Sequence, residues 1–326
     1  MKKVSICIIS FNSLKYLPYC LEAILNQTYP NIEIITIDNT STDGSIELLE
    51  NKYKDKVRLI RNVTNLGYAG GINISIKQAE GEYIMPCNPD LFMTPSFVEE
   101  MVKLIEKSKD IGMVQGKFLK LKETKDGFVN TNIIDSTGTY LTRDRRNFDR
   151  CQGEEDIGQY GKEEYIFGAS GACPLYRREM LEDVAIDGEY CDETFFMYRE
   201  EVDLNWRAQL FGWKCLYTPK AVAYHLRSYT KETRKKLPLK LRKLQFRNRY
   251  LMVYKNDSLD NFLKDLPYIL WFDLKAFIYL LVFEPRLLSA YTEVISLLPL
   301  LKKKRHYIQN KRRINKKEMR RWVVIS

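Results

Sequence analysis

Histidine is scarce in this sequence, and several common site motifs are missing. The 326 residues include two histidines, His225 and His306, which excludes a histidine-rich metal centre. The seven cysteines form no C-x-x-C pair, so we predict a reduced, cytoplasmic protein rather than a zinc site or a disulfide framework. A G-K-[ST] sequence does not occur, which excludes P-loop chemistry.

Long uncharged apolar runs are also lacking. The most apolar stretch, Pro267 to Phe283, is interrupted by Asp273 and Lys275. A membrane-spanning helix needs about 18 or more consecutive apolar residues, so we expect none here. The short apolar run after Met1 is interpreted as a first β-strand, because it is too short for a signal peptide and no small-residue cleavage site follows it.

Charge is unevenly distributed along the chain. Residues 1–226 carry 27 basic and 34 acidic side chains, whereas residues 227–326 carry 25 basic and 8 acidic ones. A basic segment attracts polyanions such as phospholipid headgroups or nucleic acid. Residues 262–301 are apolar with helical spacing between basic clusters, which is typical of a helix on an anionic membrane surface. The alternative is a helical subdomain packed on the first domain with a solvated basic face.

Strand-like and helical patterns alternate up to about residue 118, which predicts an α/β fold with a mostly parallel sheet flanked by helices. We expect strands at Val4–Ser10, Ile32–Asp38, Val57–Arg61, Glu82–Cys87 and Gly112–Phe118, with helices between them. From 130 to 161 the pattern weakens and charge increases, so a long, partly mobile connection is expected there. A helix over 200–211 and strands at 214–218 and 221–225 follow.

Polar residues follow three of the expected strands, where ligands bind in parallel sheets. These segments are Ser10–Asn12, Asp38–Asp43 and Asn88–Asp90. Their carboxylates form a candidate cation and ribose site, although Asp38, Asp43 and Asp90 could instead cap helices and turns.

A glycine-rich segment, Asn65–Asn73, follows a strand and opens a helix, an arrangement that favours a phosphate or polar ligand. Its G-x-x-G-G spacing differs from G-x-G-x-x-G, which disfavours a nicotinamide-dependent dehydrogenase.

The order of these motifs resembles that of family 2 glycosyltransferases of the GT-A fold, and most closely their bacterial rhamnosyltransferase-like branch. The resemblance covers residues 3–228. In chain order the motifs are Ser10–Asn12, Gln27–Pro30, Asp38–Gly44, Asn65–Asn73, Asn88–Asp90, Gly168–Cys173, Phe195–Arg207 and Tyr224–His225.

The resemblance implies a nucleotide-sugar site in which Asp38 accepts a hydrogen bond from a pyrimidine. The nucleotide-sugar-binding residues that it implies are Ser10, Asn12, Asp38, Asn39, Asp43, Asn65, Gly67, Asn73 and Asn88. Asn88–Asp90 occupies the place of the family's D-x-D motif, so Asp90 is expected to bind Mg²⁺ or Mn²⁺, with His225 as a second ligand or a packed core residue. The first motif position is Asn rather than Asp, which predicts weak metal binding without nucleotide.

Glu201 stands where the family usually has the Asp that acts as general base. Glu200 and Asp203 are alternatives; these two share a helix face, whereas Glu201 points elsewhere. Acidic residues are also enriched in first helical turns because of the helix dipole, which would account for one of the three.

The resemblance implies an inverting glycosyltransferase that uses a dTDP- or UDP-sugar, with rhamnose as the favoured sugar. We expect a GT-A domain at 1–228, with a nucleotide-binding half at 1–118 and an acceptor and catalytic half at 119–228, and a membrane-associating region at 229–326. The expected acceptor is a lipid-linked glycan at the inner face of the cell membrane, where the protein is expected to bind peripherally. Nucleic acid is not expected as a partner, because the aromatic residues of the tail cluster in apolar stretches.

Two other functions are compatible with parts of the sequence. One is a non-catalytic protein whose basic tail binds anionic lipid or nucleic acid. The other is a nucleotidyltransferase, which would need a Gly-rich basic loop after the first strand, where Phe11–Leu14 stands instead.

Overall fold

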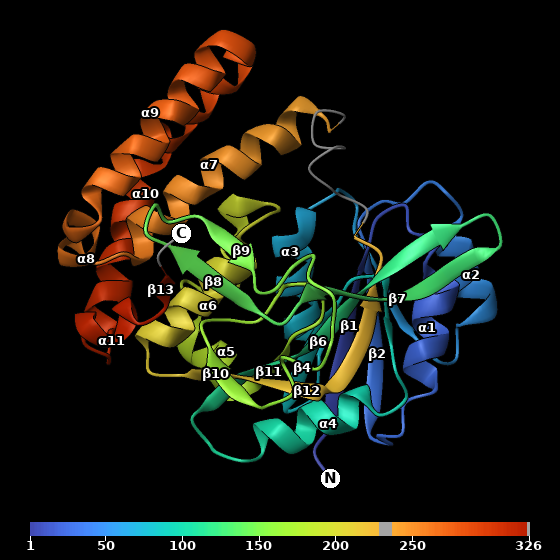
Figure 1. Ribbon diagram of the computed structural model, residues 1–326. Coiled ribbons are helices and arrows are strands. Elements are labelled where there is room, and N and C mark those ends of the chain that lie inside the picture. The colour runs from blue at the N-terminus through green and yellow to red at the C-terminus, as the bar shows by residue number, and fades with distance from the viewer. Residues whose placement is uncertain (228–236, 325–326) are drawn as a thin grey trace.

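A computed structural model describes residues 1–227 and 237–324 (Figure 1). The first half of its central sheet is parallel, with β4, β1, β2 and β3 side by side in that order. The strands are β1 (Val4–Ser10), β2 (Ile32–Asp38), β3 (Arg58–Arg61) and β4 (Tyr83–Cys87), and the helices between them are α1 (Leu17–Leu25), α2 (Ser45–Lys52) and α3 (Gly67–Gln78). β1 is buried along its whole length, as its Val- and Ile-rich sequence predicts for a central parallel strand.

The second half of the sheet mixes strand directions. β11 (Leu175–Arg177) pairs antiparallel with both β4 and β6 (Ile111–Thr124), and β12 (Lys214–His225) runs parallel to β6. The remaining elements of this half are β5 (Leu91–Met93), α4 (Phe97–Ile105), β7 (Gly127–Ser136), β10 (Glu164–Ile166), α5 (Arg178–Val184), η1 (Glu193–Phe195) and α6 (Glu200–Leu210). The predicted α/β fold with helices on both faces of the sheet is confirmed.

The expectation of a loose connection over 130–161 is wrong. This stretch completes β7 and forms β8 (Thr139–Thr142) and β9 (Asn147–Asp149), which make a small sheet with β13 (Val323–Val324) near the C-terminus. Its charged residues are held by distant partners, as in the Lys117–Asp156 ion pair. Because these contacts are long-range and polar, apolar periodicity does not reveal them. The two strands expected at 214–218 and 221–225 form one strand, β12, with an irregularity after Tyr217.

Helices make up most of the C-terminal region. They are α7 (Leu239–Asn256), α8 (Leu259–Lys264), α9 (Leu266–Phe283), η3 (Pro285–Leu288), α10 (Ser289–Lys311) and α11 (Lys316–Arg320). α7 packs against α10 and α6, whereas α9 projects from the α/β body at the upper left of Figure 1. The helical character expected for residues 262–301 is confirmed. The boundary predicted between residues 228 and 229 lies outside the described residues.

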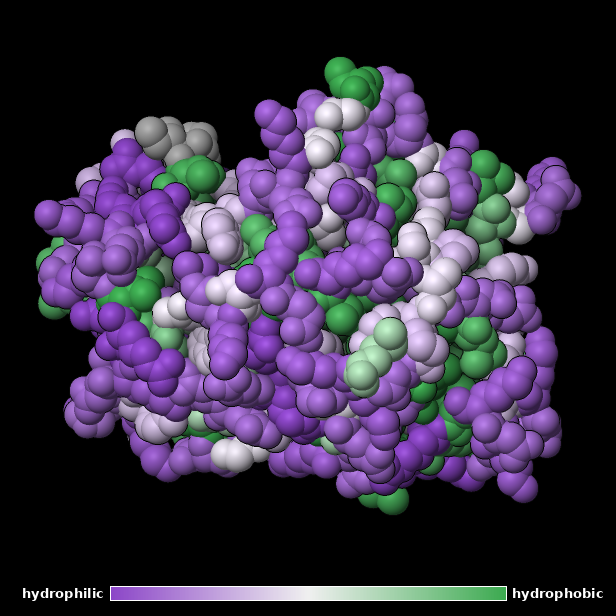
Figure 2. All heavy atoms as spheres, turned by 90° about the horizontal axis from the view of Figure 1, so that it is seen from below, coloured by the Kyte–Doolittle hydropathy of each residue, from purple (hydrophilic) through white to green (hydrophobic). Residues whose placement is uncertain are grey.

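Within residues 1–227 and 237–324, one helix is long and apolar enough to cross a membrane by length and composition alone. This is α9, and only 11% of its 18 residues are buried. Asp273, one of the two charges that interrupt this apolar stretch, is paired with Arg249 of α7 at 2.7 Å. In contrast to the exposed apolar surface of α9, the face of the molecule seen from below is mainly hydrophilic, with scattered apolar patches (Figure 2).

Candidate active site

Ser10 and Asp38 lie side by side at the carboxyl ends of β1 and β2, and both are fully buried. Asp38 Oδ1 accepts a hydrogen bond from the Ser41 backbone N–H at 2.8 Å. Asp38 Oδ2 and Ser10 Oγ have no partner among the described residues. A buried polar atom without a partner is unfavourable, so this pair marks a place where a polar ligand would complete the hydrogen bonding.

Loops around this pair are held by the predicted polar residues themselves. Asn12 Oδ1 accepts from Thr42 N at 2.8 Å, and Asn39 Nδ2 donates to Gly67 O at 3.0 Å. Asn65 Oδ1 accepts from Gly67 N at 2.8 Å, where the chain turns into α3. These side chains therefore shape the rim of the sheet.

Asp43 and Asn73 are occupied by contacts inside the protein. Asp43 accepts hydrogen bonds from the backbone N–H groups of Leu14 and Ser45, at 2.9 and 3.1 Å. Asp43 therefore has the capping role that was the alternative to ligand binding. The carboxamide of Asn73 is buried; it accepts from Cys191 N at 2.9 Å and donates to Cys191 O at 2.8 Å. Both side chains hold backbone segments in place.

Asp90 and His225 are brought together by the pairing of β5 with β12. Asp90 Oδ1 lies 3.4 Å from His225 Nε2, and His225 Nδ1 lies 2.8 Å from Asp135 Oδ2. Arg227 binds the other oxygen of Asp135 at 2.9 Å. Although burial opposes it, the carboxylates of Asp90 and Asp135 raise the pKa of His225 to about 10, so this position favours a positive charge.

The same geometry fits a divalent cation. A histidine that binds a metal usually has its other ring nitrogen fixed by a carboxylate, as Asp135 fixes His225 here. The described residues contain no group of three His, Cys, Asp or Glu side chains able to hold a metal. Asp90 and His225 would therefore supply two ligands and leave the others to phosphate oxygens and water, which suits Mg²⁺ or Mn²⁺.

The three acidic residues of α6 have different surroundings. Glu201 is partly buried and lies against Gly171, where a Cβ would come within 3.0 Å of Glu201 Cγ. Burial raises the pKa of Glu201. Burial and the nearby charge of Glu201 raise the pKa of Glu200 well above its usual range, and Glu200 Oε2 has no partner among residues 1–227 and 237–324. Asp203 is fully buried and bonds Arg207 at 3.1 Å and Lys255 at 2.9 Å.

The segment 168–173 connects the candidate regions. Tyr68 of α3 donates its hydroxyl hydrogen to Gly171 O at 2.7 Å, next to Glu201. Asn88 N donates to Ala172 O at 2.9 Å, which fixes the turn that carries Asp90. The glycine-rich helix, the Asp90 turn and the first turn of α6 thus meet at one segment.

Asp135 and Gly171 are site residues that the sequence did not single out as individual positions. Asp135 follows Ile133 and Ile134 in a strand-like pattern, and an acidic residue in such a place is a signal of a buried partner. Gly171 lies within the motif Gly168–Cys173, yet its position next to Glu201 depends on the fold.

Residues 5–185 match the sequence model of the family described as Glycosyl transferase family 2. The chain belongs to glycosyl transferase family 2. An uncharacterized glycosyltransferase of Haemophilus influenzae is 32% identical over 125 residues, which cover 38% of each protein. Poly-beta-1,6-N-acetyl-D-glucosamine synthase of Staphylococcus epidermidis is 25% identical over 229 residues, 68% of this chain and 50% of the relative.

Solved structures of glycosyltransferases share the fold of this family 2 member. Residues 1–349 of S. aureus TarS in complex with UDP-GlcNAc align with a TM-score of 0.57 and 18% identity, covering 95% of this chain and 88% of that TarS fragment. GalNAc-T7 with UDP, GalNAc and Mn²⁺ aligns with a TM-score of 0.61 and 14% identity, over 78% of this chain and 48% of that one. The matches to three curated relatives span 38%, 42% and 41% of those proteins.

Proposed function

We propose that this chain is an inverting, metal-dependent glycosyltransferase that transfers a hexose from a pyrimidine nucleoside diphosphate to a glycan. The observation that carries the proposal is the meeting of three regions at segment 168–173: Tyr68 at the start of α3, the Asp90 turn and the start of α6. Family membership supports the reaction class, and the UDP-GlcNAc bound by TarS supports a uracil or thymine nucleotide.

Each candidate residue has a distinct task in this reaction. Asp38 Oδ2 accepts the imide N–H of the pyrimidine. Asp90 and His225 would hold the cation, which neutralises charge on the leaving diphosphate. Glu201 takes the proton of the acceptor hydroxyl while that oxygen bonds to the anomeric carbon and the bond from this carbon to the diphosphate breaks on the opposite face. Burial raises the pKa of Glu201, which makes its carboxylate a stronger base.

The donor is tested directly with purified protein. The protein is incubated with one nucleotide sugar at a time and with Mg²⁺ or Mn²⁺, and the released nucleoside diphosphate is measured. The nucleotide sugars are dTDP-rhamnose, UDP-glucose, UDP-galactose, UDP-GlcNAc and GDP-mannose. Slow hydrolysis of one uracil or thymine nucleotide sugar is expected, and the rhamnose donor is our first choice. Hydrolysis of GDP-mannose alone would contradict the assigned role of Asp38, and failure of every donor to be bound or hydrolysed would overturn the proposed function.

Asp90→Ala is expected to lower kcat about 100-fold, because it removes the only carboxylate of the proposed metal pair. Binding of Mn²⁺ in the presence of nucleoside diphosphate should weaken in parallel, which titration calorimetry measures. Asp126→Ala is the control, since Asp126 lies exposed in the turn between β6 and β7. Unchanged Mn²⁺ binding in Asp90→Ala would show that the cation lies elsewhere.

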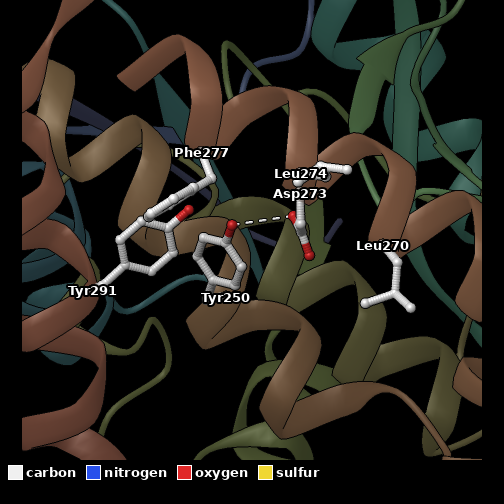
Figure 3. Close-up of a pocket in the computed structure, with 6 residues that line it drawn as sticks. All are labelled: Tyr250, Leu270, Asp273, Leu274, Phe277 and Tyr291. Carbon is white, nitrogen blue, oxygen red and sulfur yellow. Dashed lines mark hydrogen bonds between the residues drawn. The ribbon is translucent and has the colours of Figure 1, made fainter. Parts of the chain in front are cut away.

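The exposed apolar surface of α9 supports the proposed location at an anionic membrane. Trp271, Ile278 and Phe283 are 61%, 51% and 70% exposed, in a region that also exposes Lys275 and Arg286. A cavity of about 520 Å³ opens among α7, α9 and α10. It is lined by Tyr250, Leu270, Asp273, Leu274, Phe277 and Tyr291 (Figure 3). Apolar side chains next to cations are typical of helices that lie in the headgroup region.

The position of β9 between α9 and the candidate base supports a lipid-linked acceptor. The guanidinium of Arg146, at the start of the β9 hairpin strand, lies 4.9 Å from the centre of the Phe272 ring in α9. At the other end of β9, the charge of Asp149 contributes to the raised pKa of Glu201 after burial. β9 therefore lies between α9 and Glu201, which supports an acceptor presented from the side of α9.

Trp271→Glu combined with Ile278→Glu is expected to lower partitioning onto vesicles at least about 100-fold, because burying such a side chain contributes about 1.5–3 kcal/mol. Sedimentation with vesicles that contain phosphatidylglycerol measures this, and binding by the unaltered protein should fall as salt increases. The control is Ile157→Glu, which alters an 80% exposed apolar residue on the α/β body. Equal vesicle binding by both variants would contradict the location on α9.

A further inference from the structure

The segment that leads into α6 has an unfavourable backbone. Within four residues, Phe196, Tyr198 and Arg199 have φ of 61°, 72° and 72°, although none is glycine. At Phe196 the chain makes a γ-turn with positive φ, in which Met197 N donates to Phe195 O at 2.6 Å. Such turns are rare and strained, and they persist only where the surrounding structure fixes them.

Helix α7 supplies most of that fixation. Asn248 is fully buried, and its Nδ2 donates to the carbonyl oxygens of Phe195, Met197 and Tyr198 at 3.0, 2.9 and 2.9 Å. Its neighbour Arg247 donates to Thr194 O. α7 therefore binds four of the five carbonyl groups in residues 194–198.

The nucleotide side of the site holds the remaining carbonyl. Ala69 N, in the first turn of α3, donates to Phe196 O at 3.1 Å. Gly67 is packed so closely there that a Cβ would lie 2.2 Å from the same oxygen. The strained segment is thus clamped between α3 and α7.

The same helix also holds both flanks of this segment. Lys255 is fully buried; its Nζ lies 2.5 Å from Asp192 Oδ2, before the segment, and 2.9 Å from Asp203 Oδ1, in α6 after it. The direction in which α6 starts, and with it the side chain of Glu201, is consequently set by α7.

We propose that Asn248 is a positioning residue that holds Glu201 in its catalytic pose, which makes α7 part of the active site. This inference rests on the function proposed above. Without the Asn248 amide, residues 195–198 can relax to ordinary φ values, and the first turn of α6 moves with them. Displacement of a reacting group by about 1 Å costs on the order of 100-fold in rate.

Asn248→Asp tests the proposal, because it preserves the size of the side chain and replaces the donating amide by an oxygen that cannot donate when ionised. We expect kcat to fall about 100-fold while the affinity for nucleoside diphosphate, measured by calorimetry, stays within about threefold. The control is Leu301→Ala, which removes a fully buried apolar side chain of the neighbouring helix α10. It should lower the melting temperature and leave kcat unchanged.

A double-mutant cycle separates positioning from simple loss of structure. If Asn248 acts through Glu201, Asn248→Asp should slow the Glu201→Gln variant by less than about threefold, although it slows the unaltered enzyme about 100-fold. Independent, multiplying effects would overturn the proposal, as would an unchanged kcat in Asn248→Asp alone. Failure of the unaltered protein to use any nucleotide sugar would instead count against the proposed function, so the two failures are distinguishable.

Discussion

Glu201→Gln is expected to lower sugar transfer by about 100- to 10,000-fold, the range that a general base contributes. The substitution preserves the shape of the side chain beside Gly171 and removes the site that accepts the proton of the acceptor hydroxyl. Donor binding should be retained, because the predicted nucleotide contacts lie on β1, β2 and α3. Initial rates with a saturating nucleotide sugar, together with calorimetric binding of nucleoside diphosphate, measure the two effects separately.

Glu200→Gln is the comparison that decides between the neighbouring acids. Burial and the charge of Glu201 raise the pKa of Glu200 well above its usual range, which disfavours the ionised form that a base requires. We expect this variant to lose less than about tenfold in kcat. A large loss in Glu200→Gln together with a small loss in Glu201→Gln would exchange the two assignments.

The pH profile gives an independent check on the base. Burial raises the pKa of Glu201 above its ordinary value of 4.5, and the base is active only when ionised. The rate of the unaltered enzyme should therefore fall with decreasing pH along a limb centred above 4.5. In Glu201→Gln that limb should disappear, whereas its persistence would indicate a different titrating group.

The sequence predicts the parallel half of the fold well because each of its elements is locally encoded. β1 and β2 are short apolar runs, and the residues at their carboxyl ends, such as Asp38, follow from the general geometry of parallel sheets. Asp90 could be located in the same way. In each case the information lies within a few residues of the position itself.

The remaining contacts depend on residues far apart in the chain. Asp135 and His225 are 90 positions apart in the sequence, and Asn248 and Phe195 are 53 positions apart, yet each pair is hydrogen-bonded. A single sequence contains no periodic signal for such pairs, because one polar residue among apolar neighbours is compatible with many partners. For the same reason the charge and apolar spacing of the C-terminal region predict helices and a basic surface but do not identify Lys255 and Asn248, which are buried and hold the α6 segment.

Asp265→Ala is expected to lower the free energy of unfolding by about 3–5 kcal/mol, because it leaves buried charge without its partner. Asp265 is fully buried at the junction of α8 and α9, where Arg145 binds it at 2.9 Å, Arg143 at 2.8 Å and Arg320 at 3.0 Å. Arg145 is itself fully buried and would keep Asp257 as its one carboxylate partner among residues 1–227 and 237–324. Urea denaturation followed by circular dichroism measures the change.

Lowering the pH should reduce the difference in unfolding free energy between the unaltered protein and Asp265→Ala. Burial opposes ionisation of Asp265, yet hydrogen bonds from Arg320, Arg143 and Arg145 lower its pKa from 3.8 to about 2. A lowered pKa contributes stability that is complete above about 3.8 and is lost as the pH falls through about 2, so the unaltered protein and Asp265→Ala should converge over that interval. Asp260→Ala is the control, since Asp260 is exposed on the adjacent helix and pairs with exposed Lys316; no measurable change is expected there. A difference that persists undiminished at the acid end would mean that packing, rather than the Asp265 charge, attaches α9 to the β8–β9 hairpin.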